Sequence, residues 1–374
     1  MKKLRGNNIL RKKIVISGIN LFEGGTLQIY YALLDELKEN NIFQNHDVTI
    51  FVHKKNLFLK YQTERIEIIE LPKSRRNYIY RMFYEYLFFY FYSKKIDIDV
   101  WFSVHDISPN VKAKNRYVYC HNSLPLQKLK IKDYYFSPKL ILFKWFYSLF
   151  YRINIKKNTG IIVQQNWIKN KFVNMYNVSN VIVVGANRKE KIQNLDYLED
   201  ELYTFFYPAV SRPFKDFEII CKAIELYNKK RKDEMKFQVF ITIDGTENKY
   251  SHYIVEKYKH IKQIKFIGFQ NFDSMQHYYK ISNVLLFPSR AESWGLPLSE
   301  FKNFNKPILC SDLPYAHETI GNYDKVKFFQ PYNYELLAME IEKFIKGDYV
   351  FSKNTQMDSN EVINWSMLVK KIFK

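Results

Sequence analysis

The chain has 374 residues, of which 47% are hydrophobic, and its 58 Lys and Arg against 38 Asp and Glu give a formal net charge of +20. This length and apolar content exclude a disordered chain and predict roughly two globular domains. No apolar segment reaches the length of a membrane span, and no apolar core of a signal peptide follows the charged residues 1–13, so we expect a cytosolic protein.

The chain is both basic and rich in aromatic residues, with 30 Tyr and 31 Phe. A nucleic acid, an anionic membrane surface or an anionic substrate would each suit this composition, which an AT-rich genome would also produce. No DNA- or RNA-binding motif accompanies the charge, so we expect no nucleic acid partner. The widely spaced Cys120, Cys221 and Cys310 lack metal-ligand spacing and indicate buried free thiols in a reducing compartment.

The N-terminal part begins with a pattern of strand, glycine turn and helix. The apolar run 14–18 predicts a strand, Gly24 and Gly25 follow, and Thr26 is placed to cap a helix. The apolar residues of this helix recur every three or four positions, at Leu27, Tyr30, Leu34 and Leu37. A glycine loop between strand and helix suits a phosphate group, although a plain tight turn explains two glycines as well.

Six further apolar runs alternate with helical segments, which is typical of a doubly wound parallel sheet. They are residues 48–52, 66–71, 100–103, 117–120, 161–163 and 181–184. His121 follows the fourth run, at the ligand-facing end of the strand, where a purely structural histidine is the alternative. Asp97 and Asp99 precede the third run, so we interpret them as a solvated strand entrance and predict no metal ion.

Residues 75–95 and 134–157 are unusually aromatic and are flanked by cations. Both segments have the length of helices, and packing of their aromatic faces on the sheet explains most of each. Aromatic and cationic side chains also favour the interface of an anionic membrane. A basic-aromatic edge presented to a membrane is therefore a second hypothesis for one of these segments.

Residues 188–201 are charged and lack apolar periodicity, so we place the domain linker there. Strand 203–207 begins the second domain, and Lys215 is expected to open a helix with Phe217, Ile220, Ile224 and Tyr227 on its apolar face. Strand 237–243 then ends in a turn at Gly245. The remaining predicted elements are a strand at 264–269, a strand at 326–329, a helix at 334–345 and a last helix that begins near Trp365.

Residues 284–321 are the most informative stretch of the chain. The apolar run 284–287 predicts a buried strand, and a polar loop follows. Leu296 and Pro297 open a helix, because proline is tolerated in its first turn. The next strand is expected at 307–310, which completes a strand-loop-helix-strand unit of a parallel sheet.

Two carboxylates lie where the first of these strands gives way to the helix. Glu292 is in the loop, and Glu300 is expected in the first helical turn. The amides near Gly295 and Leu296 have no partner within the helix and suit a phosphate group. One loop is thus predicted to hold an anion between two acidic side chains.

The run PSRAESWGLPLSE, residues 288–300, resembles the Glu-x7-Glu motif of the retaining glycosyltransferases with the GT-B fold, the family called glycosyltransferases group 1. The resemblance is dense from 203 to 365 and sparse before it. It implies an α/β fold of two Rossmann-like doubly wound domains that face a central cleft. An ordinary Rossmann-like loop is the alternative, which thirteen positions in register make less favourable.

The domains implied by this resemblance are an acceptor-binding N-terminal domain at 1–195, a nucleotide-sugar-binding C-terminal domain at 196–355, and a helix at 356–374 that crosses back to the first domain. Glu292 would meet the hydroxyls of the donor sugar and Glu300 the ribose. The amides of Gly295 and Leu296 would bind phosphate. Further residues expected to line the donor site are Ser293, Trp294 and Gly245.

Three more positions match the family. His121 corresponds to a histidine that contacts the donor, and Gly24 and Gly25 to a loop that faces the cleft. Lys215 matches a lysine that neutralises the donor diphosphate. The arginine usually found six residues earlier is Ala209 here, which leaves open whether Arg212 substitutes for it.

The implied reaction is the transfer of a hexose from a nucleotide-diphosphate sugar to a glycan or lipid-linked acceptor, in the synthesis of a bacterial surface polysaccharide such as lipopolysaccharide or capsule. No cofactor or metal ion is expected, because lysine and helix-end amides would replace the metal. The protein would be cytoplasmic or peripheral on the inner face of the plasma membrane. Alternatives are a hydrolase, phosphorylase or epimerase of the same fold, an inactive sugar-binding member, and a basic nucleic-acid-binding protein.

Overall fold

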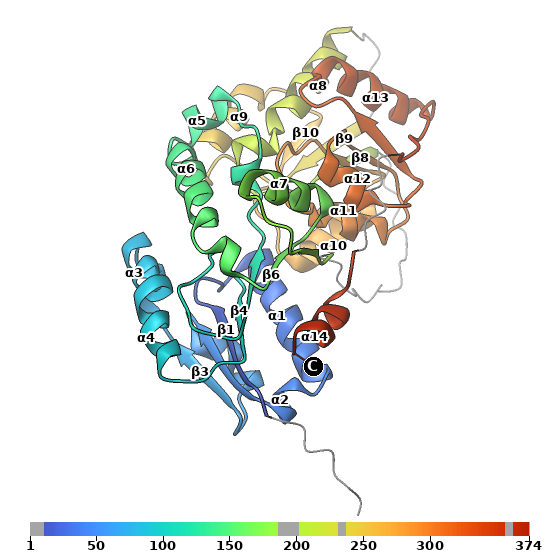
Figure 1. The fold of residues 1–374 in the computed structure, drawn as a ribbon. Coiled ribbons are helices and arrows are strands. Elements are labelled where there is room, and N and C mark those ends of the chain that lie inside the picture. The colour runs from blue at the N-terminus through green and yellow to red at the C-terminus, as the bar shows by residue number, and fades with distance from the viewer. Residues whose placement is uncertain (1–10, 186–201, 231–236, 356–361, 374) are drawn as a thin grey trace, which may run out of the picture. The chain divides into compact units, whose positions relative to one another are not determined.

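The structure, a computed structural model, describes residues 11–185, 202–230, 237–355 and 362–373 (Figure 1). The chain separates into two compact units. Unit 1 comprises residues 1–125, 144–186 and 360–374, and unit 2 comprises residues 126–143 and 187–359. The predicted linker at 188–201, with the predicted boundary at 195, lies outside the described residues.

Unit 1 contains a seven-stranded parallel sheet in the order β3-β2-β1-β4-β5-β6-β7. Its strands are β1 (Lys13–Gly18), β2 (Asp47–Val52), β3 (Ile66–Glu70), β4 (Val100–Ser103), β5 (Asn115–Cys120), β6 (Gly160–Val163) and β7 (Val181–Val183). All seven predicted apolar runs are therefore confirmed as strands. Their near-continuous burial is expected of a parallel sheet covered on both faces.

Helices cover this sheet on its two faces, because successive strand residues point to opposite sides. Ile14 and Ile16 of β1 belong to the core beneath α1 (Gly24–Glu39) and α14 (Trp365–Phe373), whereas Val15 faces Phe89 of α4 (Phe89–Lys94). The other helical segments that lie wholly in unit 1 are α2 (Ile42–Asn45), η1 (Lys55–Tyr61), η2 (Pro72–Arg75), α3 (Tyr78–Met82), the π-helical η3 (Phe83–Phe88), η5 (Ile155–Lys157) and α7 (Asn166–Tyr176). Helix α6 (Lys139–Arg152) and the short η4 (Leu124–Leu126) contain residues of both units.

The C-terminal helix returns to the N-terminal unit, as the GT-B prediction requires. Helix α14 packs on α1 in unit 1. The ring of Trp365 stacks on Tyr119 of β5 at a centroid distance of 5.3 Å, and Phe373 packs on Phe102 of β4. Trp365 thus anchors this helix to the sheet.

Helix α1 confirms its predicted apolar face, but its predicted cap is wrong. Leu27, Tyr30, Leu34 and Leu37 are all buried. The helix begins at Gly24, two residues before Thr26, and the Thr26 hydroxyl donates 3.3 Å to the carbonyl of Glu23 inside the first turn. Gly24 can begin the helix because it tolerates a φ of +67°.

Unit 2 contains a six-stranded parallel sheet in the order β10-β9-β8-β11-β12-β13. The strands are β8 (Tyr203–Tyr207), β9 (Phe237–Ile241), β10 (Ile264–Phe266), β11 (Val284–Phe287), β12 (Ile308–Ser311) and β13 (Val326–Phe329). Its helical segments are α5 (Ile131–Phe136), η6 (Pro213–Lys215), α8 (Phe217–Lys230), α9 (Lys249–Tyr258), α10 (Phe272–Ile281), α11 (Leu296–Lys302), α12 (Pro314–Ile320) and α13 (Tyr334–Lys346). The predicted strands of the second domain are confirmed.

Two predictions about helix starts in unit 2 are corrected. Lys215 does not open helix α8 but ends the short turn η6, since Asp216 adopts a φ of +57° and separates the two. The predicted apolar face of α8, from Phe217 to Tyr227, is buried. Glu300 is the fifth residue of α11 and therefore lies just beyond its first turn.

Residues 126–143 lie between unit 1 segments in the sequence but group with unit 2. Helix α5 holds them there through both charge and packing. Asp133 forms a buried ion pair with Arg290, and the ring of Phe136 packs on Tyr250 and Tyr253 at centroid distances of 5.3 and 5.0 Å. The predicted N-terminal domain at 1–195 placed this segment in the first domain.

Three smaller predictions concern polar and reactive groups. Cys120, Cys221 and Cys310 are buried free thiols, as predicted. Asp97 and Asp99 stand at the entrance of β4, where both form ion pairs with Lys114. Within the ranges that the structure describes, no helix is long and apolar enough to cross a membrane.

Candidate functional site

The order of the unit 2 sheet creates a switch point between β8 and β11. The chain proceeds outward from β8 through β9 and β10 and then returns to β11 on the other side. Ligands of doubly wound sheets bind at such points, beyond the carboxyl ends of the strands. The loop after β8 carries Lys215, and the loop after β11 carries Glu292.

Lys215 and Glu292 meet at this switch point. The ammonium group of Lys215 forms an ion pair with Oε1 of Glu292, and each side chain is 13% exposed. The Tyr207 hydroxyl donates 2.6 Å to the Lys215 carbonyl, and the Gln127 amide donates 3.3 Å to the Glu292 carbonyl. Strand β8 and segment 126–143 therefore hold the backbones of the pair, while both charged ends remain partly exposed.

Gly295 shapes the end of the loop that carries Glu292. It has a φ of +85° and is the N-cap of α11. A Cβ at this position would approach Cδ1 of Leu298 to 3.2 Å and would strain a left-handed backbone. Leu296 follows as the first helical residue, so the amides of both residues lie at the helix start, as predicted.

The two residues between Glu292 and Gly295 differ in burial. Trp294 is buried, its indole donates 2.8 Å to the Ser299 hydroxyl, and its carbonyl accepts a hydrogen bond from Thr319. Trp294 thus fastens the loop to α11 through its side chain and to α12 through its carbonyl. Ser293 is half-buried.

Glu300 lies on α11, the helix that follows this loop. Its Oε2 accepts a 2.7 Å hydrogen bond from the hydroxyl of Tyr279 on α10. Glu292 and Glu300 thus lie on either side of the start of α11 within the same unit. The sequence predicted this arrangement of one loop carboxylate and one helix carboxylate.

The remaining predicted donor-site residues of unit 2 follow β8 and β9. Arg212 is the exposed N-cap of η6 and forms no ion pair with the described residues. At the family's usual arginine position, Ala209 instead exchanges backbone hydrogen bonds of 2.8 and 2.9 Å with the Thr242 hydroxyl. Gly245 adopts a φ of +96° in the turn after β9.

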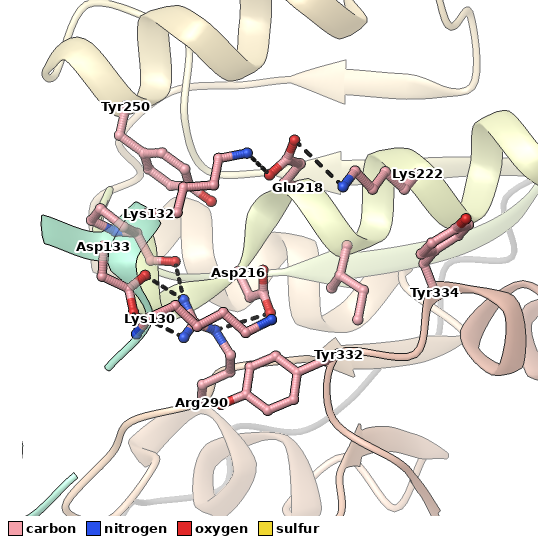
Figure 2. A pocket seen from close by; sticks show the side chains of 12 residues that line it. Lys130, Lys132, Asp133, Asp216, Glu218, Lys222, Tyr250, Arg290, Tyr332 and Tyr334 are labelled. Carbon is pink, nitrogen blue, oxygen red and sulfur yellow. Dashed lines mark hydrogen bonds and ion pairs between the residues drawn. The ribbon is translucent and has the colours of Figure 1, made fainter. Parts of the chain in front are cut away.

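Arg290 is a residue of this site that the sequence reasoning missed. Its guanidinium binds both carboxylate oxygens of Asp133 at 3.0 and 2.5 Å, forms a 3.0 Å ion pair with Asp216, and donates 3.0 Å to the Pro213 carbonyl (Figure 2). Its backbone amide also donates 2.9 Å to the carbonyl of Phe214. Arg290 thus ties the turn of Lys215 to the loop of Glu292.

The charges of this buried cluster balance one another. Burial is the largest influence on Arg290 and opposes its charge, yet Asp133 and Asp216 outweigh it and raise the pKa of the guanidinium. Burial also raises the pKa of the Asp216 carboxyl, although Arg290 and Lys130 oppose the rise. A buried bidentate pair of this kind is stable only while both partners are present.

A cavity of about 140 Å³ adjoins the cluster, as Figure 2 shows. Lys130 lies over the ring of Tyr332 at 3.5 Å, and Arg290 lies over the same ring at 5.4 Å. Lys132 and Lys222 both form ion pairs with Glu218. Because these charges are already paired, we interpret the cavity as part of the support of the Lys215 turn.

Unit 1 has its own switch point, between β1 and β4. Gly24 and Gly25 are exposed at the start of α1, in the connection that follows β1. Asp106 follows β4, has a φ of +70°, and its Oδ1 accepts the amides of His121 and Asn122 at 2.7 and 3.0 Å and the Tyr151 hydroxyl at 3.0 Å. One carboxylate therefore fixes the loop after β5.

His121 follows β5 as predicted and is buried. Its Nε2 lies 3.5 Å from Oδ2 of Asp106, and its Nδ1 has no hydrogen-bond partner among the described residues. Burial is the main influence and lowers the pKa of the imidazole, although Asp106 opposes this. The ring therefore favours its neutral form.

A second buried network beside it was also missed. His105 contacts Glu85 of η3 through Nε2 and the carbonyl of Ser17 through Nδ1 at 2.8 Å. Arg81 donates 2.8 Å to the His105 carbonyl. The only signal in the sequence was the pair His105-Asp106 just after a predicted strand, a position that often carries polar site residues.

Metal binding is not suggested by the arrangement of side chains. Within residues 11–185, 202–230, 237–355 and 362–373, no three His, Cys, Asp or Glu side chains gather as a metal site would require. The absence of a bound ion in the reaction remains a prediction.

Comparison with known proteins agrees with this arrangement. Residues 187–361 match the model of the family described as "Glycosyl transferases group 1". This region, which carries Lys215, Glu292 and Glu300, is therefore similar to the group 1 glycosyltransferases. The match includes the described strands and helices of unit 2 from β8 to α13.

The chain is also 24% identical over 221 residues to the O-antigen chain mannosyltransferase RfbU of Salmonella typhimurium. That alignment covers 57% of this chain and 61% of the mannosyltransferase, so the chain spans about three fifths of this curated relative.

Two solved structures resemble the whole fold. A glycosyltransferase from Rickettsia africae aligns with a TM-score of 0.60 and 15% identity, over 90% of this chain and 89% of its own. HepE from Anabaena in complex with UDP-glucose aligns with a TM-score of 0.53 and 13% identity, over 90% of each chain. Together with the two parallel sheets, these likenesses establish two Rossmann-like domains of the GT-B class.

Proposed function

We propose that this protein is a retaining glycosyltransferase that moves a sugar from a nucleotide-diphosphate sugar to a glycan or lipid-linked acceptor. The observation that carries the proposal is the partly exposed ion pair of Lys215 and Glu292 at the β8–β11 switch point, beside the left-handed Gly295. It lies within the region that matches the glycosyltransferase family.

The departing nucleoside diphosphate needs fixed positive partners in the transition state. Lys215 would supply one charge, and the amides of Gly295 and Leu296 would supply hydrogen bonds. Arg212, exposed beside Lys215, is our candidate for the second cation that Ala209 does not provide. On donor binding, Lys215 would leave Glu292 and pair with the diphosphate. Glu292 would then be free to bind the sugar.

Glu292 and Glu300 would then orient the two sugars joined by the diphosphate. We assign the hydroxyls of the transferred sugar to Glu292 and the ribose hydroxyls to Glu300, which Tyr279 already positions. The acceptor would attack on the face that the leaving phosphate vacates, and that phosphate would assist its deprotonation. Contact of the neutral His121 with the donor sugar is supported by the resemblance and by its place after β5.

The pathway we propose is the synthesis of a bacterial surface polysaccharide, with the protein in the cytoplasm or peripheral on the inner face of the plasma membrane. The likeness to an O-antigen mannosyltransferase supports a polysaccharide acceptor. The HepE structure, which holds UDP-glucose, supports a nucleotide sugar as donor.

The test is a thermal-shift screen with nucleotide sugars, followed by product analysis with and without a glycan or lipid-linked acceptor and with a chelator. We expect one donor to stabilise the protein and its sugar to reach the acceptor with unchanged anomeric configuration. Release of free sugar alone would instead indicate a hydrolase of the same fold. The Glu292→Gln variant, with near-native shape, should bind nucleotide but fail to transfer.

A further inference from the structure

A row of apolar side chains runs along the outside of the helical stretch at residues 78–94 of unit 1. Helices α3, η3 and α4 form one continuous helical stretch over residues 78–94 (Figure 1). Ile79, Phe83, Leu87 and Phe91 are spaced by four residues and are 78%, 48%, 52% and 57% exposed. Residues four apart on a helix share one face, so these side chains form a single stripe.

Packing on the sheet explains the opposite side of this stretch but not the stripe. Phe89 is fully buried against Phe51 and Trp101, and Phe88 and Tyr92 pack beside it. The centre of the helical stretch is a π-helical turn, which holds more residues per turn than an α-helix. Side chains four positions apart therefore stay on one side of the stretch. The rings of the stripe lie beside neighbouring rings, Tyr84 beside Phe83 and Tyr90 beside Phe91, and all four of its side chains remain about half exposed or more.

Helix α6 presents a second exposed face. Trp145 is 69% exposed, and Phe146 and Leu149 are exposed with it, while Tyr147 on the other side is buried. The Arg81 guanidinium donates 3.3 Å to the Tyr147 hydroxyl and so joins α3 to α6 within unit 1. We call the following set, which lies on the one helical stretch at residues 78–94, the basic-aromatic surface: Ile79, Phe83, Leu87 and Phe91.

The charge around these residues is almost entirely positive. Residues 72–95 contain a single acidic residue, Glu85, which is buried against His105, and residues 137–157 contain none. Exposed cations lie at both ends of the stripe: Lys73, Arg75, Arg76, Lys94 and Lys95. A partner of this surface must therefore be both apolar and anionic.

We propose that the basic-aromatic surface docks the protein on an anionic lipid bilayer. Exposed aliphatic and aromatic side chains can enter the acyl boundary, while Lys and Arg meet the headgroups. A nucleic acid would match the cations, but its bases and phosphates offer no apolar surface that suits the aliphatic side chains of Ile79 and Leu87. Binding would be peripheral, since no helix of the described residues can cross a membrane.

The test is co-sedimentation of the full chain with vesicles of phosphatidylethanolamine containing phosphatidylglycerol, and with vesicles of phosphatidylcholine alone. We expect binding to the anionic vesicles that weakens with salt. Phe91→Glu should weaken it about tenfold or more, since it removes an exposed aromatic side chain that would enter the bilayer and adds a charge that the headgroups repel. Phe269→Glu in unit 2, where the phenylalanine is 82% exposed, is the matched control and should bind like the parent.

The electrostatic part is tested separately. Replacement of Arg75 and Arg76 by Gln should weaken vesicle binding about thirtyfold, because each cation near an anionic surface contributes about 1 kcal/mol. The same change at the exposed Lys262 and Lys265 of unit 2 should have little effect. All four positions are exposed, so the variants should retain the thermal midpoint of the parent.

Several outcomes would overturn the proposal. One is equal binding to vesicles of phosphatidylcholine alone. Another is vesicle binding that neither Phe91→Glu nor the arginine replacements weaken. A third is that these variants lose self-association of the protein and not its binding to vesicles. Binding of an RNA oligomer by the same arginines without vesicle binding would also exclude it. Because no nucleotide sugar is used, the result is independent of the proposed transfer reaction.

Discussion

The carboxyl ends of the two sheets differ in how they use charge. In unit 2, Lys215 and Glu292 pair at the switch point with both side chains partly exposed. In unit 1, His105, Asp106 and Glu85 are buried and pair with the backbone or with one another. The comparison indicates that both edges use buried charge to hold their loops, and that the unit 2 edge adds a partly exposed charged pair that could meet a ligand.

The largest effect should come from the buried network of unit 1. Asp106→Ala leaves the amides of His121 and Asn122 and the Tyr151 hydroxyl without their acceptor, and it places a Cβ-bearing apolar residue at positive φ. We expect the free energy of unfolding to fall by about 4 kcal/mol, measured by urea denaturation.

Asp106→Asn is the matched control, because its amide oxygen still accepts and asparagine tolerates a left-handed backbone. It should lose much less stability than the alanine variant. Equal losses in both variants would show that the charge, not the acceptor, holds the loop after β5.

The second effect should separate the units by function. Lys215→Met keeps most of the side-chain volume but removes the charge, so turnover should fall about 100- to 1,000-fold, as expected when one partner of a developing anion is lost. The free energy of unfolding should fall by less than in Asp106→Ala, by about 1–2 kcal/mol, because Glu292 loses its partner but stays partly exposed to solvent. Single-turnover rates with the identified donor are the measurement, and Lys262→Met is the control. Near-normal turnover would remove Lys215 from the diphosphate site.

Arg290 offers an intermediate case, since it is buried like the unit 1 network but supports the partly exposed pair. Arg290→Lys keeps the charge but loses the fork that binds Asp133 at two oxygens. We expect a loss of about 2 kcal/mol in the free energy of unfolding, together with reduced turnover at saturating donor.

A surface pair provides the reference for that experiment. Lys114→Gln breaks ion pairs with Asp97 and Asp99 at the entrance of β4 and should change the free energy of unfolding little, because Lys114 is exposed to solvent. If Arg290→Lys costs no more than Lys114→Gln, the buried cluster does not organise the Lys215 turn.

The smallest effect concerns pH. Burial lowers the pKa of His121 below 6.5, so between the two pKa values the unfolded chain binds a proton that the folded chain does not. The contribution of His121 to stability is thus complete above pH 6.5 and is lost as the pH falls below it. The difference in unfolding free energy between the parent and His121→Gln should shrink from pH 7.5 to 5.5. A constant difference would show that His121 does not titrate in this way.

The sequence predicted most of the fold because each strand is an apolar run bounded by polar or turn residues. It failed at the starts of α1 and α8, where single residues with positive φ, Gly24 and Asp216, decide the boundary. The sequence predicted that Glu292, Gly295 and Lys215 belong to one site, because the first two stand in one continuous motif and Lys215 matches a single lysine of the family. The prediction of their roles still awaits experiment.

Contacts between distant residues were beyond the sequence. Asp133 and Arg290 are 157 positions apart, and neither stands in a pattern that marks it as a partner of the other. Glu85 and His105 are closer in sequence, yet an acidic residue within an aromatic helix is expected to face solvent, so its position does not predict that Glu85 is buried. In both cases tertiary packing, not local preference, decided the burial of the charge.

The return of α14 to unit 1 has a consequence for synthesis of the protein. Trp365, Leu368 and Ile372 belong to the same core as Ile14 and Tyr30 of the first strand and helix. Domains often fold one after another as they leave the ribosome. Here the face of the first sheet that α1 and α14 share stays partly uncovered until residues 365–373 have emerged, whereas the opposite face, beneath Phe89, does not depend on them.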